Sequence, residues 1–102
     1  MRYLLTVAFM LATTPAMASP VCAVVESLAR LAMGHRQTGQ TEAEARAQFR
    51  NTNFRNQTAL ALVADFLVTE AYRSPVATPD QRLAVIREFG QHHHDHCLRL
   101  AP

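Results

Sequence analysis

The sequence of 102 residues has no lysine and no tryptophan, and only three glycines and two cysteines. Three widely spaced glycines leave no Gly-rich loop that could hold a phosphate group. All ten basic residues are arginines, set against eight acidic ones and scattered along the chain. A nucleic-acid-binding domain normally carries a basic patch, so this balance argues against a nucleic-acid partner.

Motifs of enzyme active sites are also missing. Ser19, Ser27 and Ser74 stand outside any nucleophile-elbow context, and no pair of carboxylates is placed for the hydrolysis of a glycosidic bond. His35 comes where an apolar stripe ends, a position typical of a partner for a helix C-terminus. We therefore expect a protein that is not an enzyme and has no catalytic residue.

The N-terminus has the three parts of a secretory signal. Met1 and Arg2 are followed by an apolar run over Tyr3–Ala12, and small residues precede Ser19. We predict cleavage between Ala18 and Ser19, which leaves a single domain at 19–102 in the periplasm or outside the cell. The alternative is a membrane anchor, but the run of about 10 apolar residues is half of what a span needs. We thus expect no membrane anchor after cleavage.

Cys22 and Cys97 lie near the two ends of the predicted domain. In an exported chain two cysteines most simply form an intramolecular disulfide. The alternatives are free thiols, metal ligation or an intermolecular bond. A disulfide that closes a loop of this size contributes about 4 kcal/mol in the chain-entropy model.

Two helices are predicted in the first half of the domain. Apolar residues over 21–32 recur at helical spacing, and we expect this helix to end near Gly34, with Gly39 as a second break. Thr41 and Glu44 have the spacing of a capping box. A short helix is expected to follow.

This short helix is predicted over Glu42–Arg50, with Ala45 and Phe49 facing inward. The segment Asn51–Gln57 is rich in Asn and Thr, which favour turns, and is predicted to be a loop.

The most apolar stretch of the domain, Thr58–Arg73, predicts a central, buried helix that ends at Ser74-Pro75. Asp65 and Glu70 interrupt it. We expect them to mark its exposed edge; if buried, they would need arginine partners.

A last helix is predicted from Thr78, Pro79 and Gln81, which match a capped helix start. Its inward face is expected to hold Leu83, Ile86, Phe89, Gly90, His93, Cys97 and Leu100. The predicted fold is all-α: a small bundle of three long helices and one short helix, closed by a Cys22–Cys97 disulfide.

The histidine run near the C-terminus is the one conspicuous cluster. Glu88, His92 and His96 are spaced four residues apart, so on a helix they could offer a carboxylate and two imidazoles to Zn, Cu or Ni. The alternative is a solvated last turn, where histidines complement the helix dipole. We expect no obligatory cofactor.

Short motifs run through most of residues 22–98. They comprise Cys22, Leu28-Ala29-Arg30-Leu31-Ala32, Arg36-Gln37-Thr38-Gly39-Gln40-Thr41, Glu70-Ala71-Tyr72-Arg73-Ser74-Pro75, Ile86, Phe89 and Cys97. This pattern resembles a group of small exported or phage-associated proteobacterial helical proteins of unknown function with an early and a late Cys. The resemblance implies a helical, disulfide-closed fold and no particular activity. The histidine run departs from the group's pattern.

Three functions remain open from the sequence. The first is a non-enzymatic module that binds another protein, of inhibitor or immunity type, through a helix face or the loops Arg36–Thr41 and Asn51–Gln57. The second is metal binding through the histidine cluster. The third is a periplasmic protein that responds to acid, since five histidines change charge near pH 6.

Overall fold

The computed structural model describes residues 20–51 and 57–100. It consists of α2 (Pro20–Gln37), α3 (Glu42–Arg50), α4 (Thr58–Tyr72), the short 3₁₀ helix η2 (Pro79–Gln81) and α5 (Arg82–Leu100). Three long helices and one short α-helix, without a strand in these ranges, confirm the all-α prediction. The predicted export signal, its cleavage site and most of the loop 51–57 lie outside the described residues.

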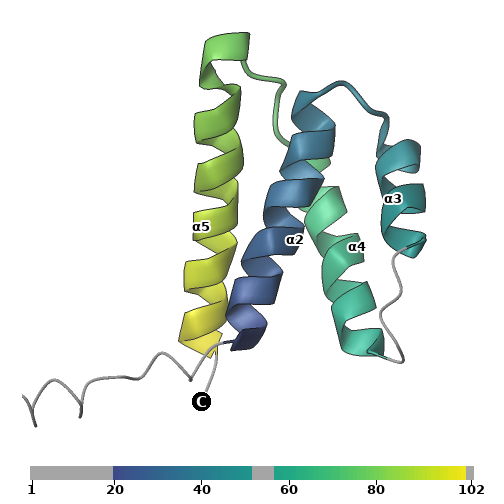
Figure 1. Cartoon of the computed structure of the whole chain (residues 1–102), viewed down its shortest axis with the longest axis vertical. Coiled ribbons are helices and arrows are strands. Elements are labelled where there is room, and N and C mark those ends of the chain that lie inside the picture. Colours follow the sequence, from purple (N-terminus) through teal and green to yellow (C-terminus); the bar gives the residue numbers. More distant parts are fainter. Residues whose placement is uncertain (1–19, 52–56, 101–102) are drawn as a thin grey trace, which may run out of the picture.

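Helix α2 lies at the centre of the bundle, with α5 on one side and α4 on the other, and α3 packs on α4 (Figure 1). The prediction of α4 as the central helix is therefore wrong. Both Ala29 and Ala32 of α2 are fully buried, and their small side chains let neighbouring helices approach closely. Helix α4 buries one face only, because its outer residues Leu62 and Phe66 remain exposed.

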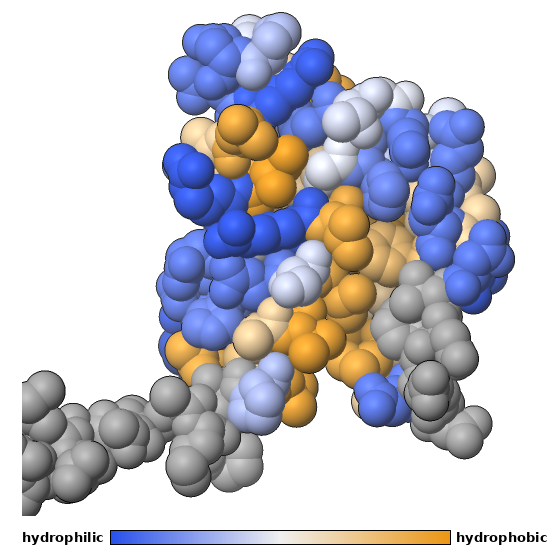
Figure 2. Space-filling view, viewed as in Figure 1, coloured by the Kyte–Doolittle hydropathy of each residue, from blue (hydrophilic) through white to orange (hydrophobic). Residues whose placement is uncertain are grey.

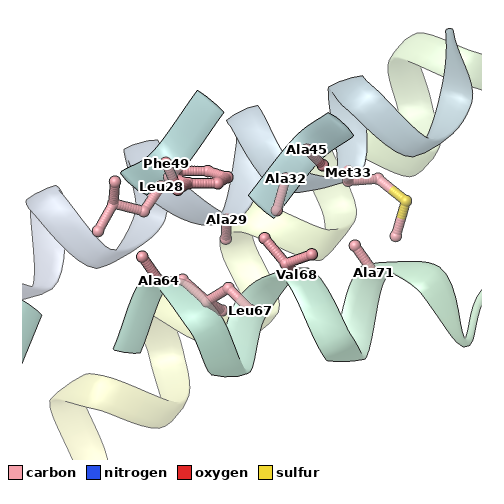
Figure 3. Packing of buried hydrophobic residues seen from close by; sticks show 10 residues of the cluster. All are labelled: Leu28, Ala29, Ala32, Met33, Ala45, Phe49, Ala64, Leu67, Val68 and Ala71. Carbon is pink, nitrogen blue, oxygen red and sulfur yellow. The ribbon is translucent and has the colours of Figure 1, made fainter. Parts of the chain in front are cut away.

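The core forms where α2, α3 and α4 meet, and Figure 3 shows alanines alternating with larger side chains there. Its buried members are Leu28, Ala29, Ala32, Met33, Ala45, Phe49, Ala64, Leu67, Val68 and Ala71. Ala45 and Phe49 face inward as predicted. On the other side of α2, Gly90 of α5 allows close contact, because a Cβ at Gly90 would lie 2.6 Å from Cγ of Arg30.

Helix α2 continues through Gly34 to Gln37, so the predicted end near Gly34 is wrong. The last turn holds because the backbone N–H and the hydroxyl of Thr38 both donate to the carbonyl of Gly34, at 3.0 and 2.9 Å. The chain turns at Gly39, whose φ of +88° favours glycine. Of the two predicted breaks, the one at Gly39 is therefore where the chain turns out of the helix.

The capping box of α3 is confirmed. The N–H of Glu44 donates to Oγ1 of Thr41 at 3.1 Å, and the N–H of Thr41 donates to Oε1 of Glu44 at 2.8 Å. The predicted start of the last helical segment is confirmed in position, because Thr78 is its N-cap and Pro79 follows at the first helical position. The capping box is not formed, because Thr78 makes no side-chain cap bond. The 3₁₀ turn at Pro79 instead uses the Thr78 carbonyl, which accepts from the N–H of Gln81 at 2.9 Å.

The Cys22–Cys97 disulfide is present and joins the first turn of α2 to the last turns of α5, with 5.5 Å between the two Cα atoms. Two residues predicted to face inward on α5 are exposed: Leu83 by 75% and Leu100 by 72%. Both lie in terminal turns, which have fewer neighbouring helices. Among the described residues, no helix combines the length and apolar character that crossing a membrane requires.

Candidate functional site

An apolar groove lies between α4 and α5, with α2 as its floor. We refer to it as the α4–α5 groove; its volume is about 270 Å³. It is lined by Val25, Val63, Phe66, Leu67, His93, His96, Cys97 and Leu100. Its walls are therefore hydrophobic side chains, the disulfide and two imidazoles. Because Cys97 lies in the wall, the disulfide fixes one side of the groove to α2.

A wider hollow of about 730 Å³ continues from this groove along the first turns of α2 and α4. The two share Val25 and Val63 in their linings. The other residues of the hollow are Pro20, Val21, Val24, Gln57, Thr58, Ala59 and Leu60. No charged residue lines either depression. Together they form one apolar surface that follows α2 toward its N-terminus.

Large apolar side chains are exposed on and beside this surface. Phe66 and Val21, which line it, are 53% and 61% exposed. Leu62 is 67% exposed and lies on the same face of α4 as Ala59 and Phe66, three residues after one and four before the other. Hydrophobic surface also forms a band along the middle of the face seen in Figure 2, between hydrophilic regions. Single exposed apolar residues are ordinary, but a continuous patch bounded by polar surface is typical of an interaction site.

His93 forms part of the α5 wall and is buried. Its ring packs edge-on against Phe89 at 4.5 Å and Phe66 at 6.1 Å between ring centroids. Burial lowers the pKa of His93 below its ordinary value of 6.5, and the neighbouring imidazoles of His92 and His96 act in the same direction, against the opposing charge of Glu70. The imidazole is thus held in its neutral, hydrophobic form.

The residues predicted as a metal site lie on the outer part of α5. Glu88, His92 and His96 are exposed, and His96 also lines the groove. In the ranges 20–51 and 57–100, no three His, Cys, Asp or Glu side chains are arranged to hold a metal ion. The structure therefore does not bring these three residues together as a binding site.

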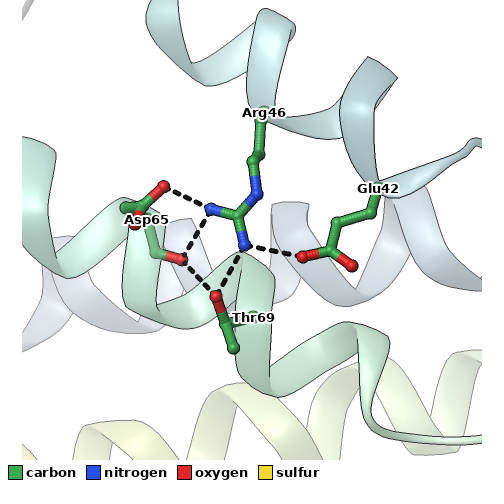
Figure 4. A network of polar contacts seen from close by, with 4 residues as sticks. All are labelled: Glu42, Arg46, Asp65 and Thr69. Carbon is green, nitrogen blue, oxygen red and sulfur yellow. Dashed lines mark hydrogen bonds and ion pairs between the residues drawn. The ribbon is translucent and has the colours of Figure 1, made fainter.

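A network of polar contacts joins α3 to α4 around the guanidinium of Arg46 (Figure 4). It donates to Glu42 and to the hydroxyl of Thr69, both at 2.6 Å, and forms an ion pair with Asp65. The hydrogen bond with Glu42 and the nearby carboxylates raise the pKa of Arg46. Asp65 is exposed, as predicted, and also has an arginine partner, so this network holds the two helices together.

The segment Arg36–Thr41 was expected to be open to a partner, but two of its side chains bind the α4–α5 connection. Nε of Arg36 donates to the carbonyl of Ser74 at 2.9 Å, and its guanidinium lies 5.3 Å from the ring centre of Tyr72. The Tyr72 hydroxyl donates to the carbonyl of Gln40 at 2.7 Å. Burial raises the pKa of Tyr72 above its ordinary value of 10, which further favours the protonated hydroxyl that donates this bond.

Gln37 completes this contact and is 1% exposed. Its amide nitrogen donates to the carbonyl of Pro75 at 3.1 Å, and its amide oxygen accepts from the N–H of Ala77 at 2.7 Å. We call Arg36, Gln37 and Tyr72 the connection clamp. Sequence reasoning missed this role because its partners lie 38 to 40 residues from Gln37 and Arg36.

His35 lies near the end of α2, as expected, with its ring edge-on to Phe49 at 6.0 Å. No protein-family model, curated protein or solved structure matches this chain.

Proposed function

We propose that this protein is a non-enzymatic interaction module of an oxidising compartment, and that it binds polypeptides through the α4–α5 groove. The observation that carries the proposal is the exposure of Phe66, which lines this groove, and of Leu62, one helical turn before it on α4. Removal of apolar surface from water favours association by about 25 cal/mol per Å². Aromatic side chains beside a hydrophobic depression are frequent centres of binding energy.

The chemistry of the groove supports binding over catalysis. A reaction centre needs polar groups placed around the reacting bond. The polar side chains in the groove lining are His93 and His96 alone, and His93 is already packed between two phenylalanines. This lining favours a hydrophobic ligand surface.

Export is supported by two independent features, the N-terminal signal pattern and the Cys22–Cys97 disulfide. Disulfides persist mainly in oxidising compartments such as the periplasm. We therefore place the interaction in the periplasm or outside the cell. Expression of the full chain in a Gram-negative host tests this: the mass of the accumulated protein should show Ser19 as its first residue. A cytoplasmic protein that retains Met1 and Arg2 would contradict export.

The binding surface is tested by immobilising the oxidised protein and measuring which polypeptides of a cell-envelope extract it retains. Leu62→Asp should abolish retention, because it puts a charge on the edge of the apolar surface. Leu83→Asp is the matched control, since Leu83 is also an exposed leucine but lies in the first turn of α5, whereas the α5 residues of the groove begin at His93. Equal retention by both variants would contradict the proposal.

A further inference from the structure

The two ends of the Cys22–Cys97 disulfide differ in their exposure. Cys22 is buried, with 2% of its surface exposed, whereas Cys97 is partly exposed and lines the α4–α5 groove. The groove volume of about 270 Å³ lies near the lower end of the range for small-molecule pockets. A small molecule that enters the groove therefore meets Cys97 rather than Cys22.

The two ends also differ in how well each sulfur carries a negative charge. Cys22 lies in the first turn of α2, and Cys97 lies near the C-terminal end of α5. The free N–H groups and the dipole of a helix N-terminus stabilise a thiolate, whereas the carbonyl groups of a C-terminus disfavour one. In thiol–disulfide exchange, the sulfur that leaves takes the electron pair, and the more stable thiolate leaves faster. Cys22 is therefore the better leaving group, and attack is directed to Cys97.

The lining of the groove does not oppose an anionic nucleophile. Its described residues include no aspartate or glutamate, and its two polar side chains are the imidazoles of His93 and His96. His96 directly precedes Cys97 on α5, and His93 comes one turn earlier. An imidazole offers an N–H donor and no negative charge. No carboxylate of this lining thus repels a thiolate that approaches Cys97.

We propose that Cys97 is a thiol-exchange site, at which a small external thiol forms a mixed disulfide. The thiol loses its proton to water, and its sulfur anion attacks Sγ of Cys97. A new S–S bond forms there, the Cys22–Cys97 bond breaks, and Cys22 leaves with the electron pair as a thiolate. One S–S bond replaces another, so the step needs no further oxidant or reductant.

The consequence of this exchange is a modified groove. The organic group of the thiol then lies beside Cys97 in the groove wall, and α5 is no longer covalently joined to α2. The site requires no polypeptide partner, so this inference goes beyond the proposed function and does not depend on it.

Brief reaction of the oxidised protein with 2-mercaptoethanol tests the assignment. The reaction is quenched at low pH, free thiols are blocked with N-ethylmaleimide, and the chain is cleaved after arginine. Because Arg30 and Arg87 lie between the two cysteines, mass spectrometry finds them in different peptides. We expect the mercaptoethanol adduct on Cys97 and the maleimide on Cys22, in an excess of at least about tenfold over the reverse pattern.

The same reaction in guanidinium is the first control, because unfolding removes both the helices and the groove. There the two patterns should be about equally abundant. An adduct mainly on Cys22 in the folded protein would overturn the assignment. So would an equal distribution in the folded protein, because neither burial nor the helix ends would then direct the attack.

The variant Leu100→Glu tests the groove as the route to Cys97. Leu100 is exposed and lines the groove, so a glutamate there places a negative charge near the approaching thiolate. Leu83→Glu is the matched control, because Leu83 is equally exposed but lies in the first turn of α5, about 21 Å along the helix from Cys97. Far-UV circular dichroism shows whether both variants are folded.

At low ionic strength we expect Leu100→Glu to react about threefold more slowly than the wild type, and Leu83→Glu to react at the wild-type rate. Equal rates for the two variants would overturn the groove as the route. The proposed function fails on a different measurement, the retention of polypeptides, so the two results are distinguishable.

Discussion

The buried amide of Gln37 connects the end of α2 to the segment that leads into α5. The Gln37 side chain is buried, and it binds the carbonyl of Pro75 and the N–H of Ala77 through two part-buried hydrogen bonds. Replacement of Gln37 by leucine leaves both backbone groups without this partner. We expect Gln37→Leu to lower the free energy of unfolding by about 1–3 kcal/mol, measured by urea denaturation.

The matched control is Gln91→Leu. Gln91 is an exposed residue of α5 whose side-chain amide donates to Oδ1 of Asp95 at 2.9 Å. Its replacement should change stability by less than about 0.5 kcal/mol. If Gln37→Leu lowers the free energy of unfolding by no more than Gln91→Leu does, the connection clamp does not stabilise the fold.

His93 predicts that acid destabilises the protein. Its pKa is lowered in the folded state, chiefly by burial, so the unfolded chain binds a proton at a higher pH than the folded chain does. Below about pH 6.5 the unfolded state therefore holds more protons, and stability decreases as the pH falls through this window. The decrease stops once the folded state is protonated as well.

Urea denaturation at pH 7.5 and at pH 5.5 measures this effect. We expect the wild type to lose more stability between the two pH values than His93→Leu, which lacks the titrating group. The groups that face His93 are Glu70 on α4 and His92 and His96 on α5, and all remain in the variant. An identical loss in both proteins would show that His93 does not cause the acid sensitivity.

At the residue scale, the sequence was informative where partners are close along the chain. The Thr41–Glu44 capping box was predictable because its two members are three residues apart. The contacts of Gln37 could not be predicted, since Pro75 and Ala77 approach it only after α4 has folded back along α2.

At the element scale, the two predicted caps give a direct comparison. Thr41 makes the side-chain bond that caps α3, whereas Thr78 makes no such bond before α5. We expect Thr41→Ala to lower stability by about 1 kcal/mol, the usual value of a helix N-cap. Thr78→Ala should lower the free energy of unfolding by less than about 0.5 kcal/mol. Thermal unfolding of the two variants measures the difference; equal losses would contradict the assignment.

The helices themselves were largely predictable, and their neighbours were not. The bounds Glu42–Arg50 follow from the cap and the periodicity, and both are local features. Which helix occupies the centre depends on how many of its faces other helices cover. Helix α4 is more hydrophobic, but the fully buried alanines of α2 allow it to pack between two partners. The apolar residues of α4 that no helix covers, Leu62 and Phe66, remain exposed instead.

At the scale of the whole molecule, the Cys22–Cys97 disulfide was predictable from the premise of export and from the number of cysteines. The groove was not, because it arises from the positions of three helices that no local pattern specifies. The disulfide also contributes to the groove itself. It ties the α5 wall of the groove, through Cys97, to the first turn of α2.

The most direct test of this arrangement is the free energy of unfolding of the oxidised protein compared with the double variant Cys22→Ala, Cys97→Ala. The disulfide closes a loop with a sequence separation of 75. We therefore expect guanidinium denaturation to show a loss of about 4 kcal/mol in the double variant. A difference of less than about 0.5 kcal/mol would contradict the claim that the disulfide holds α2 and α5, and with them the groove, in place.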